Sequence, residues 1–149
     1  MARQKLCKLW KANACSRLAD SYARAGYLTV IPDIFAGDAI PSDIPEGQLN
    51  LTAWFPNHQP ANVEPIIEKT IAYMRDDLGI QTIGAVGYCF GGRYVARFLA
   101  EGKGVDLGFT AHPSVLSNAE IAQIVNPISI AAGGECALAV ACVVSRLTR

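Results

Sequence analysis

Residues 80–96 constrain the fold of this chain more than any other stretch. An apolar run over residues 80–86 is followed by an abrupt turn between glycines and then by a sequence of helical character. Cys89 lies at the apex of the turn, and Gly87 and Gly91 lie two residues on either side. This spacing is typical of a nucleophile on a strained turn between a strand and a helix, where small neighbours let the two elements approach each other.

The turn predicts a particular chemistry for its cysteine. A thiol at the amino end of a helix faces the helix dipole and amide hydrogens, which favour the reactive thiolate. The amide of Phe90, the next residue, is placed to donate a hydrogen bond to the oxyanion that forms when a carbonyl is attacked. We therefore interpret Cys89 as the candidate nucleophile and Phe90 as the candidate backbone oxyanion donor.

Two other uses of such a turn have to be weighed. Glycine-rich turns between a strand and a helix also bind phosphates and dinucleotides, and a single cysteine is often buried and inert. The stretch has no Gly-x-Gly-x-x-Gly, because Gly84 and Gly87 are spaced wrongly, and no Gly-Lys-Ser/Thr follows. The pattern therefore favours a nucleophile over a cofactor site.

Composition narrows the classes of partner and location. Lysine plus arginine equals aspartate plus glutamate, at 13 each, so the charge gives no sign of a nucleic-acid or anionic-membrane partner. The five cysteines have no paired spacing, which argues against a disulfide framework or a zinc site and suits a reducing compartment. The basic first residues are not followed by an apolar core of signal-peptide length, so we expect a cytoplasmic protein. The apolar run 136–144 is too short to span a bilayer, which needs ~20 residues.

Helices and strands are expected to alternate along the chain, which predicts the α/β class. One helix is expected from Ser16 to Gly26, one from Pro65 to Gly79, one after the turn through residues 94–99 to Gly102, and a short one opened by a capping box of Ser117 and Glu120. The expected strands cover residues 27–31, 80–86, 106–111 and 127–132. This order predicts a doubly wound, mostly parallel sheet with right-handed crossovers. We expect residues 1–149 to form a single domain.

The segment 33–60 reads as a loop rich in proline and glycine that follows an expected strand. Because loops after the carboxyl ends of parallel strands surround the ligand crevice, this segment supplies candidate pocket residues. They are Asp33, Phe35, Trp54, Phe55 and His58. Simple packing is favoured for Trp54 and Phe55, and a surface position outside the chemistry is favoured for His58.

Residues 87–94, Gly-Tyr-Cys-Phe-Gly-Gly-Arg-Tyr, resemble the elbow of the dienelactone hydrolase family, α/β-hydrolases that use cysteine where most relatives use serine. The resemblance extends over about residues 17–132 and includes residues 26–38 and 109–114, the latter similar to the fungal branch. It implies a carboxymethylenebutenolidase-like hydrolase that acylates Cys89 and releases the acyl group with water. The implied partner is a small ester or lactone, with no metal and no organic cofactor.

The ends of the chain depart from that family pattern. The resemblance implies a catalytic acid just after the expected strand 127–132 and a histidine some tens of residues later. Glu135 stands near the first position, but no histidine follows His112. A structural or pocket-lining role is favoured for His112 over that of general base. We therefore expect a sheet that is incomplete at both ends, a truncated or altered family member, and acylation with weak or absent turnover.

Two further hypotheses stay open at this point. The chain is alternatively a non-catalytic α/β-hydrolase-fold remnant that acts as a binding module. A redox-sensing role for Cys89 with Cys136 as its partner is the least favoured of the three. The sequence leaves the ester and the oligomeric state open.

Overall fold

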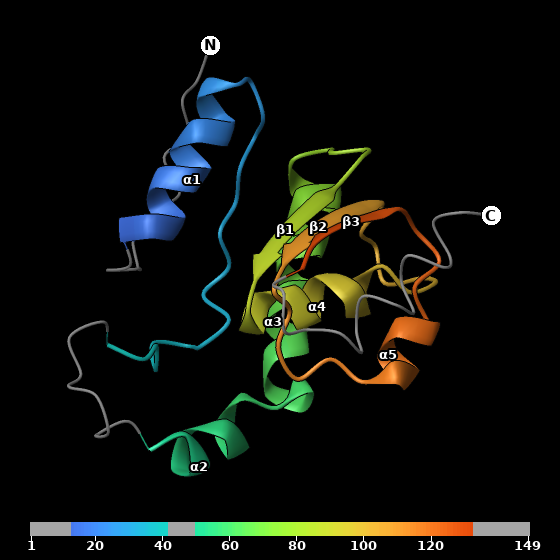
Figure 1. The fold of residues 1–149 in the computed structure, drawn as a ribbon. Helices are drawn as coiled ribbons and strands as arrows, with labels where there is room; N and C mark the ends of the chain where they lie inside the picture. Colours follow the sequence, from blue (N-terminus) through green and yellow to red (C-terminus); the bar gives the residue numbers. More distant parts are fainter. Residues whose placement is uncertain (1–12, 42–49, 133–149) are drawn as a thin grey trace. The chain divides into compact units, whose positions relative to one another are not determined.

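The computed structural model in Figure 1 describes residues 13–41 and 50–132. The chain divides into two compact units, residues 1–70 and residues 71–149, and each is treated by itself. In the described part of the chain, no helix is both long enough and apolar enough to cross a membrane.

The first unit begins with helix α1, Asn13–Arg24. It starts three residues before the expected cap at Ser16. Its end is as expected, because Gly26 adopts a φ of 95°. The amides of Gly26 and Tyr27 donate to the carbonyls of Ala23 and Tyr22, which is the hydrogen-bond pattern of a Schellman motif.

The strand predicted over residues 27–31 does not form, so that prediction is wrong. Residues 27–33 have no regular structure, and the side chains of Tyr27 and Leu28 are 67% and 49% exposed. A strand exists only through its ladder with a neighbouring strand. Residues 13–41 and 50–70 contain no other strand that could pair with it. The β-branched and aromatic residues of the run are therefore not sufficient to form a strand here.

Helical segments occupy residues 51–77. They are α2 (Leu51–Trp54), a 3₁₀ turn (Phe55–His58), α3 (Pro60–Ala72) and a π-helical turn (Tyr73–Asp77). The prediction that Pro65 lies in the first turn of its helix is wrong, since Pro60 is the first residue. Proline suits that position because its missing amide hydrogen has no partner there in any helix. Gly79, at a φ of 66°, follows the π-helical turn.

The second unit holds a parallel sheet of three strands in the order β1 (Gly84–Tyr88), β2 (Leu107–Ala111) and β3 (Ile128–Ala131). Helix α4 (Phe90–Phe98) connects β1 to β2, and α5 (Asn118–Ala122) connects β2 to β3. This confirms the predicted α/β class and parallel sheet. The first strand begins later than expected, and α4 ends at Phe98 rather than at Gly102.

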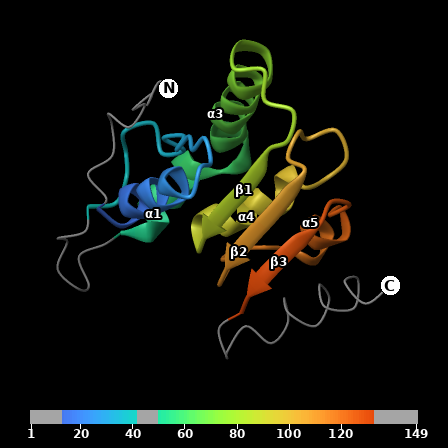
Figure 2. The same cartoon turned by 90° about the horizontal axis from the view of Figure 1, so that it is seen from above.

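Helix α4 packs against β1 and β2, and the two views in Figures 1 and 2 agree on this. Val95, Phe98 and Leu99 are at most 5% exposed and form the centre of the core. The opposite face of the sheet is more open. There, Val86 and Leu107 are 41% and 48% exposed.

An ion pair joins the π-helical turn that precedes β1 to the residue just before β2. Arg75 Nη2 lies 2.7 Å from Asp106 Oδ2, and Arg75 also donates to the carbonyls of Ile80, Gln81 and Gly104. The backbone amide of Ile83 and the Arg75 guanidinium both donate to the Asp106 carboxylate and hold its pKa below the usual range. This network fixes the start of β1 against the start of β2.

Candidate active site

Cys89 is the single residue between β1 and α4. β1 ends at Tyr88 and α4 begins at Phe90. Cys89 has φ 49° and ψ −114°, a backbone conformation that a non-glycine residue rarely adopts. Its thiol is free and the residue is exposed. The predicted strand, turn and helix are therefore confirmed as local structure, with a strained cysteine at the apex of the turn.

The close approach of β1 and α4 depends on Gly87. A Cβ atom at this position would lie 2.5 Å from the Gly91 carbonyl oxygen and 2.7 Å from Val95 Cγ2. Real Cβ atoms do not approach backbone atoms so closely, so only glycine fits. The sequence interpretation of a steric need at this position is correct.

The same interpretation is wrong for Gly91, whose Cβ would meet nothing within 4 Å. The second glycine that the packing requires is Gly92, whose Cβ would lie 2.2 Å from Thr110 Oγ1 and 3.0 Å from Pro113 Cβ. Gly91 contributes its backbone to the contact with Gly87, and this needs no particular side chain. In the sequence, the adjacent glycines at 91 and 92 are the feature that could have indicated the steric need at Gly92.

The backbone of Cys89 is hydrogen-bonded to the segment that follows β2. Its amide donates to the Ala111 carbonyl at 3.1 Å, and its carbonyl accepts from the Ser114 amide at 3.0 Å. The same carbonyl also accepts from the Gly92 amide at 3.1 Å, within the first turn of α4. The strained residue is thus held by β2 and by α4.

Phe90, the candidate oxyanion donor, is the first residue of α4. The amide of a first helical residue points out of the amino end of the helix rather than toward an earlier carbonyl within it. The Phe90 ring lies 5.2 Å from the Tyr94 ring, centroid to centroid. This contact orients the residue next to Cys89.

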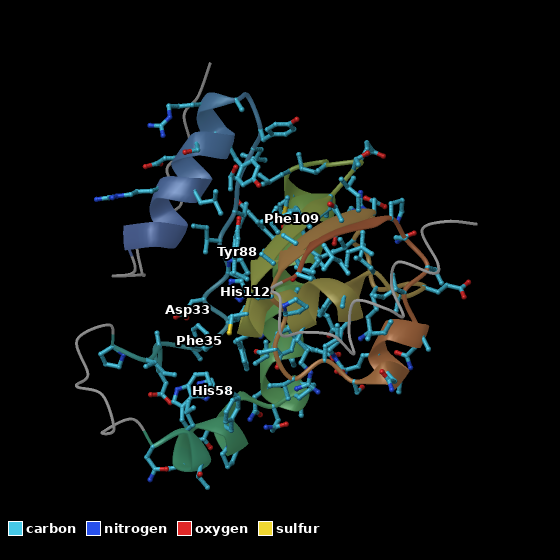
Figure 3. The ribbon with its side chains drawn as sticks, viewed as in Figure 1. Asp33, Phe35, His58, Tyr88, Phe109 and His112 are labelled. Carbon is cyan, nitrogen blue, oxygen red and sulfur yellow. The ribbon has the colours of Figure 1, made fainter. Side chains whose placement is uncertain are left out.

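His112 directly follows β2, as Cys89 directly follows β1. Because the last residues of the two strands, Tyr88 and Ala111, are paired, Cys89 and His112 lie at the same end of the sheet. Its ring is exposed and lies 6.4 Å from the ring of Tyr88, and both residues are labelled in Figure 3. Within residues 71–132, no hydrogen bond joins the imidazole to the Cys89 thiol. The expected pocket-lining or structural role for His112 stays a prediction.

The rings of four of the five pocket candidates from the loop contact one another in the first unit. The rings of Trp54 and His58 stack at 3.7 Å, and the Phe35 and Trp54 rings lie 5.4 Å apart. Figure 3 labels Asp33, Phe35 and His58. The surface position predicted for His58 is wrong, since the residue is 3% exposed. Burial follows from the Trp54 stack and from the 2.8 Å contact between His58 Nδ1 and the Trp54 carbonyl.

The carboxylate of Asp33 serves its own loop. It accepts hydrogen bonds from the amides of Phe35, at 3.2 Å, and of Gly37, at 2.8 Å. Such contacts stabilise a local turn. Phe55 lies 5.6 Å from Trp54, ring to ring, which agrees with the packing role favoured for both aromatics.

A buried carboxylate joins α4 to α5. Glu120, 6% exposed, accepts from Arg93 Nε at 2.8 Å, from Arg97 Nη1 at 2.5 Å and from the Ser117 amide at 2.7 Å. Burial opposes its ionisation, but the hydrogen bonds from Ser117, Arg97 and Arg93 outweigh it and lower the pKa to about 2. The predicted capping box of Ser117 and Glu120 is confirmed. The two arginines were missed, although their i, i+4 spacing places them on one helix face.

Two residues named above as candidates, Glu135 and Cys136, lie outside the described residues. In residues 13–41 and 50–132, no group of three or more histidine, cysteine, aspartate or glutamate side chains is arranged to hold a metal ion.

A parallel sheet with a strained, exposed cysteine between β1 and α4 defines an α/β protein built like the α/β-hydrolases. The model of the dienelactone hydrolase family matches residues 10–147. The chain belongs to this family.

Curated relatives of the chain are similar to it over most of its length. Hydrolase pyvD of Aspergillus violaceofuscus is 42% identical over 118 residues, which make up 79% of this chain and 47% of the relative. Hydrolase tropI of Talaromyces stipitatus is 42% identical over 126 residues, 79% of this chain and 49% of the relative. Dienlactone hydrolase 1 of Gibberella moniliformis is 31% identical over 118 residues, 75% of this chain and 45% of the relative. The chain spans about half the length of these relatives, and no solved structure matched it.

Proposed function

We propose that the chain carries the acylation half of a cysteine-dependent ester hydrolase, with Cys89 as nucleophile and the Phe90 amide as oxyanion donor. The observation that carries the proposal is the exposed Cys89 at φ 49° between β1 and α4. A strained residue at a sheet edge is a frequent mark of function. Family membership supports small carboxylic esters or lactones as the substrate class. The unpaired spacing of the cysteines supports a cytoplasmic location.

The chemistry of the first step follows from the two groups at the turn. Cys89 Sγ, as thiolate, attacks the ester carbonyl, and the negative charge that develops on the carbonyl oxygen receives the Phe90 amide hydrogen. The tetrahedral intermediate then collapses. The C–O bond to the leaving alcohol breaks, the thioester remains on Cys89, and the alkoxide takes a proton from solvent.

Release of the acyl group requires a water molecule and a base to take its proton. Within the unit that contains Cys89, His112 is the histidine that the structure describes, and its ring makes no hydrogen bond to the thiol. Water attack on the thioester is therefore slow in our proposal. A stoichiometric burst followed by weak turnover is the expected kinetic signature.

The first prediction concerns this burst. Mixing the protein with a chromogenic aryl acetate is expected to release one equivalent of phenol rapidly, because acylation precedes a slower hydrolysis. Cys89→Ala is expected to lose the burst, since no nucleophile remains at the turn. Cys7→Ala, which removes another of the five cysteines and leaves the turn unchanged, is the control that is expected to keep it. Stopped-flow absorbance measures both.

The alternative, a non-catalytic fold remnant with a binding role, predicts another outcome. It is favoured if the protein and Cys89→Ala release phenol at the same rate. That result would remove the enzyme hypothesis and leave family membership intact.

A further inference from the structure

The strained conformation of Cys89 needs an external support, because the residue is not a glycine. At φ 49° and ψ −114°, a cysteine left to itself would relax toward negative φ. The residue is also at a chain reversal, where a strand ends and a helix begins. Contacts outside these two elements therefore decide whether the conformation persists.

The segment of residues 111–114, here called the strap, supplies these contacts. The Ala111 carbonyl accepts from the Cys89 amide at 3.1 Å, and the Ser114 amide donates to the Cys89 carbonyl at 3.0 Å. The strap is itself fixed to β3, because the His112 amide donates to the Ala131 carbonyl at 2.9 Å. The strap therefore forms hydrogen bonds with both the amide and the carbonyl of Cys89.

Side chains at the strap press against the first turn of α4. A Cβ at Gly92 would lie 3.0 Å from Pro113 Cβ and 3.1 Å from Pro113 Cα, so the proline rests directly on the Gly92 backbone. Thr110, one residue before the strap, places Oγ1 on the same glycine. Among the described residues, this buried oxygen has no hydrogen-bond partner, so its contact with Gly92 is one of steric packing.

We propose that the strap positions Cys89 for acylation and that Pro113 is a positioning residue, acting on the thiol through the backbone of Cys89 and Gly92. The catalytic part of this inference, the positioning of Cys89 for acylation, rests on the proposed function. Its structural part, the support of the Cys89 backbone, stands independently of any ester chemistry. His112 belongs to the strap, with a φ of 38°, so its ring position depends on the same segment.

Hydrogen exchange tests the structural part by NMR on isotope-labelled protein. In the wild type, the amides of Cys89 and Ser114 are expected to exchange slowly. In Pro113→Gly, they are expected to exchange about tenfold faster while the amides within β2 and β3 keep their protection, because only the strap is loosened. Unchanged exchange at Cys89 in Pro113→Gly would overturn the inference, whatever the ester assay gives.

Two rates test the catalytic part. Acylation by the aryl acetate needs both the thiol and the oxyanion donor in place, whereas alkylation by iodoacetamide needs the thiol alone. Pro113→Gly is expected to slow acylation about tenfold more than alkylation, since small misplacements of reacting groups are costly. Equal slowing of both rates would contradict a positioning role, and no acylation of the wild type would refute the proposed function while leaving the exchange test valid.

Pro127→Gly is the matched control, because Pro127 is an exposed residue just before β3 and away from the strap. It is expected to lose a similar small amount of stability with no change in Cys89 exchange or in the ratio of the two rates. The same changes in Pro127→Gly would overturn the proposal. Pro113→Ala, which restores part of the backbone restriction, is expected to give intermediate values and serves if the glycine variant does not fold.

Discussion

Replacing Gly87 by alanine is expected to cost about 3 kcal/mol of folding free energy, the upper end of the usual range for an overpacked site. The added Cβ would lie 2.5 Å and 2.6 Å from the Gly91 carbonyl oxygen and carbon. Backbone atoms in the first turn of a helix cannot rotate away as a side-chain tip can, so β1 and α4 must separate. Urea unfolding followed by circular dichroism measures the loss as a lower midpoint.

Gly91→Ala is the matched control for this prediction. The two glycines lie two residues on either side of Cys89, but a Cβ at Gly91 meets nothing within 4 Å. Its stability is expected to be unchanged or slightly higher, because alanine is the better helix former. Equal destabilisation by both variants would contradict the packing described for this turn.

Replacing Glu120 by glutamine is expected to destabilise the protein by about 3 kcal/mol near neutral pH. The change removes the negative charge between Arg93 and Arg97 and leaves both guanidinium groups half-buried beside a neutral amide. The amide also cannot accept every hydrogen bond that the carboxylate does. The link between α4 and α5 weakens as a result.

The pH dependence of this effect has a defined sign. The pKa of Glu120 falls from an ordinary 4.5 to about 2 in the folded protein. The stability that its negative charge contributes is therefore complete above pH 4.5 and is lost as the pH falls from 4.5 to about 2. The stability difference between the wild type and Glu120→Gln is expected to shrink over that interval. Glu101→Gln, at an exposed glutamate, is the control without an effect. A stability difference between the wild type and Glu120→Gln that stays constant down to a pH of about 2 would contradict the role assigned to the Glu120 charge.

Local rules in the sequence were sufficient for the part of the fold that carries the site. The turn at Cys89 combines a strand, a required glycine and a helix within a few residues, so its geometry is determined by neighbours in the chain. The capping box of Ser117 and Glu120 is equally local. Both were predicted correctly for this reason.

Features that depend on distant partners were beyond the same rules. The run 27–31 has the composition of a strand, but strand formation is decided by a partner that the described part of its unit lacks. Glu120 could be recognised as a member of a capping box, but its second role depends on arginines 27 and 23 residues away. His58 is buried because Trp54 stacks on it, which no single-residue preference indicates.

The support for Cys89 was likewise invisible in the sequence. The hydrogen bond that Cys89 donates to Ala111 and the one that it accepts from Ser114 involve backbone atoms only, so they do not depend on residue type. The close contact of Pro113 with Gly92 is visible only once β2 is paired with β1. The register of the sheet, rather than any motif, brings these residues together.

Intact-protein mass spectrometry after brief mixing with an aryl acetate tests the central claim most directly. We expect the mass to increase by one acetyl group, with peptide mapping placing the acetyl group on Cys89 and with no increase in Cys89→Ala. An unmodified Cys89 under conditions that acetylate the other cysteines would contradict the claim that this turn presents an activated nucleophile.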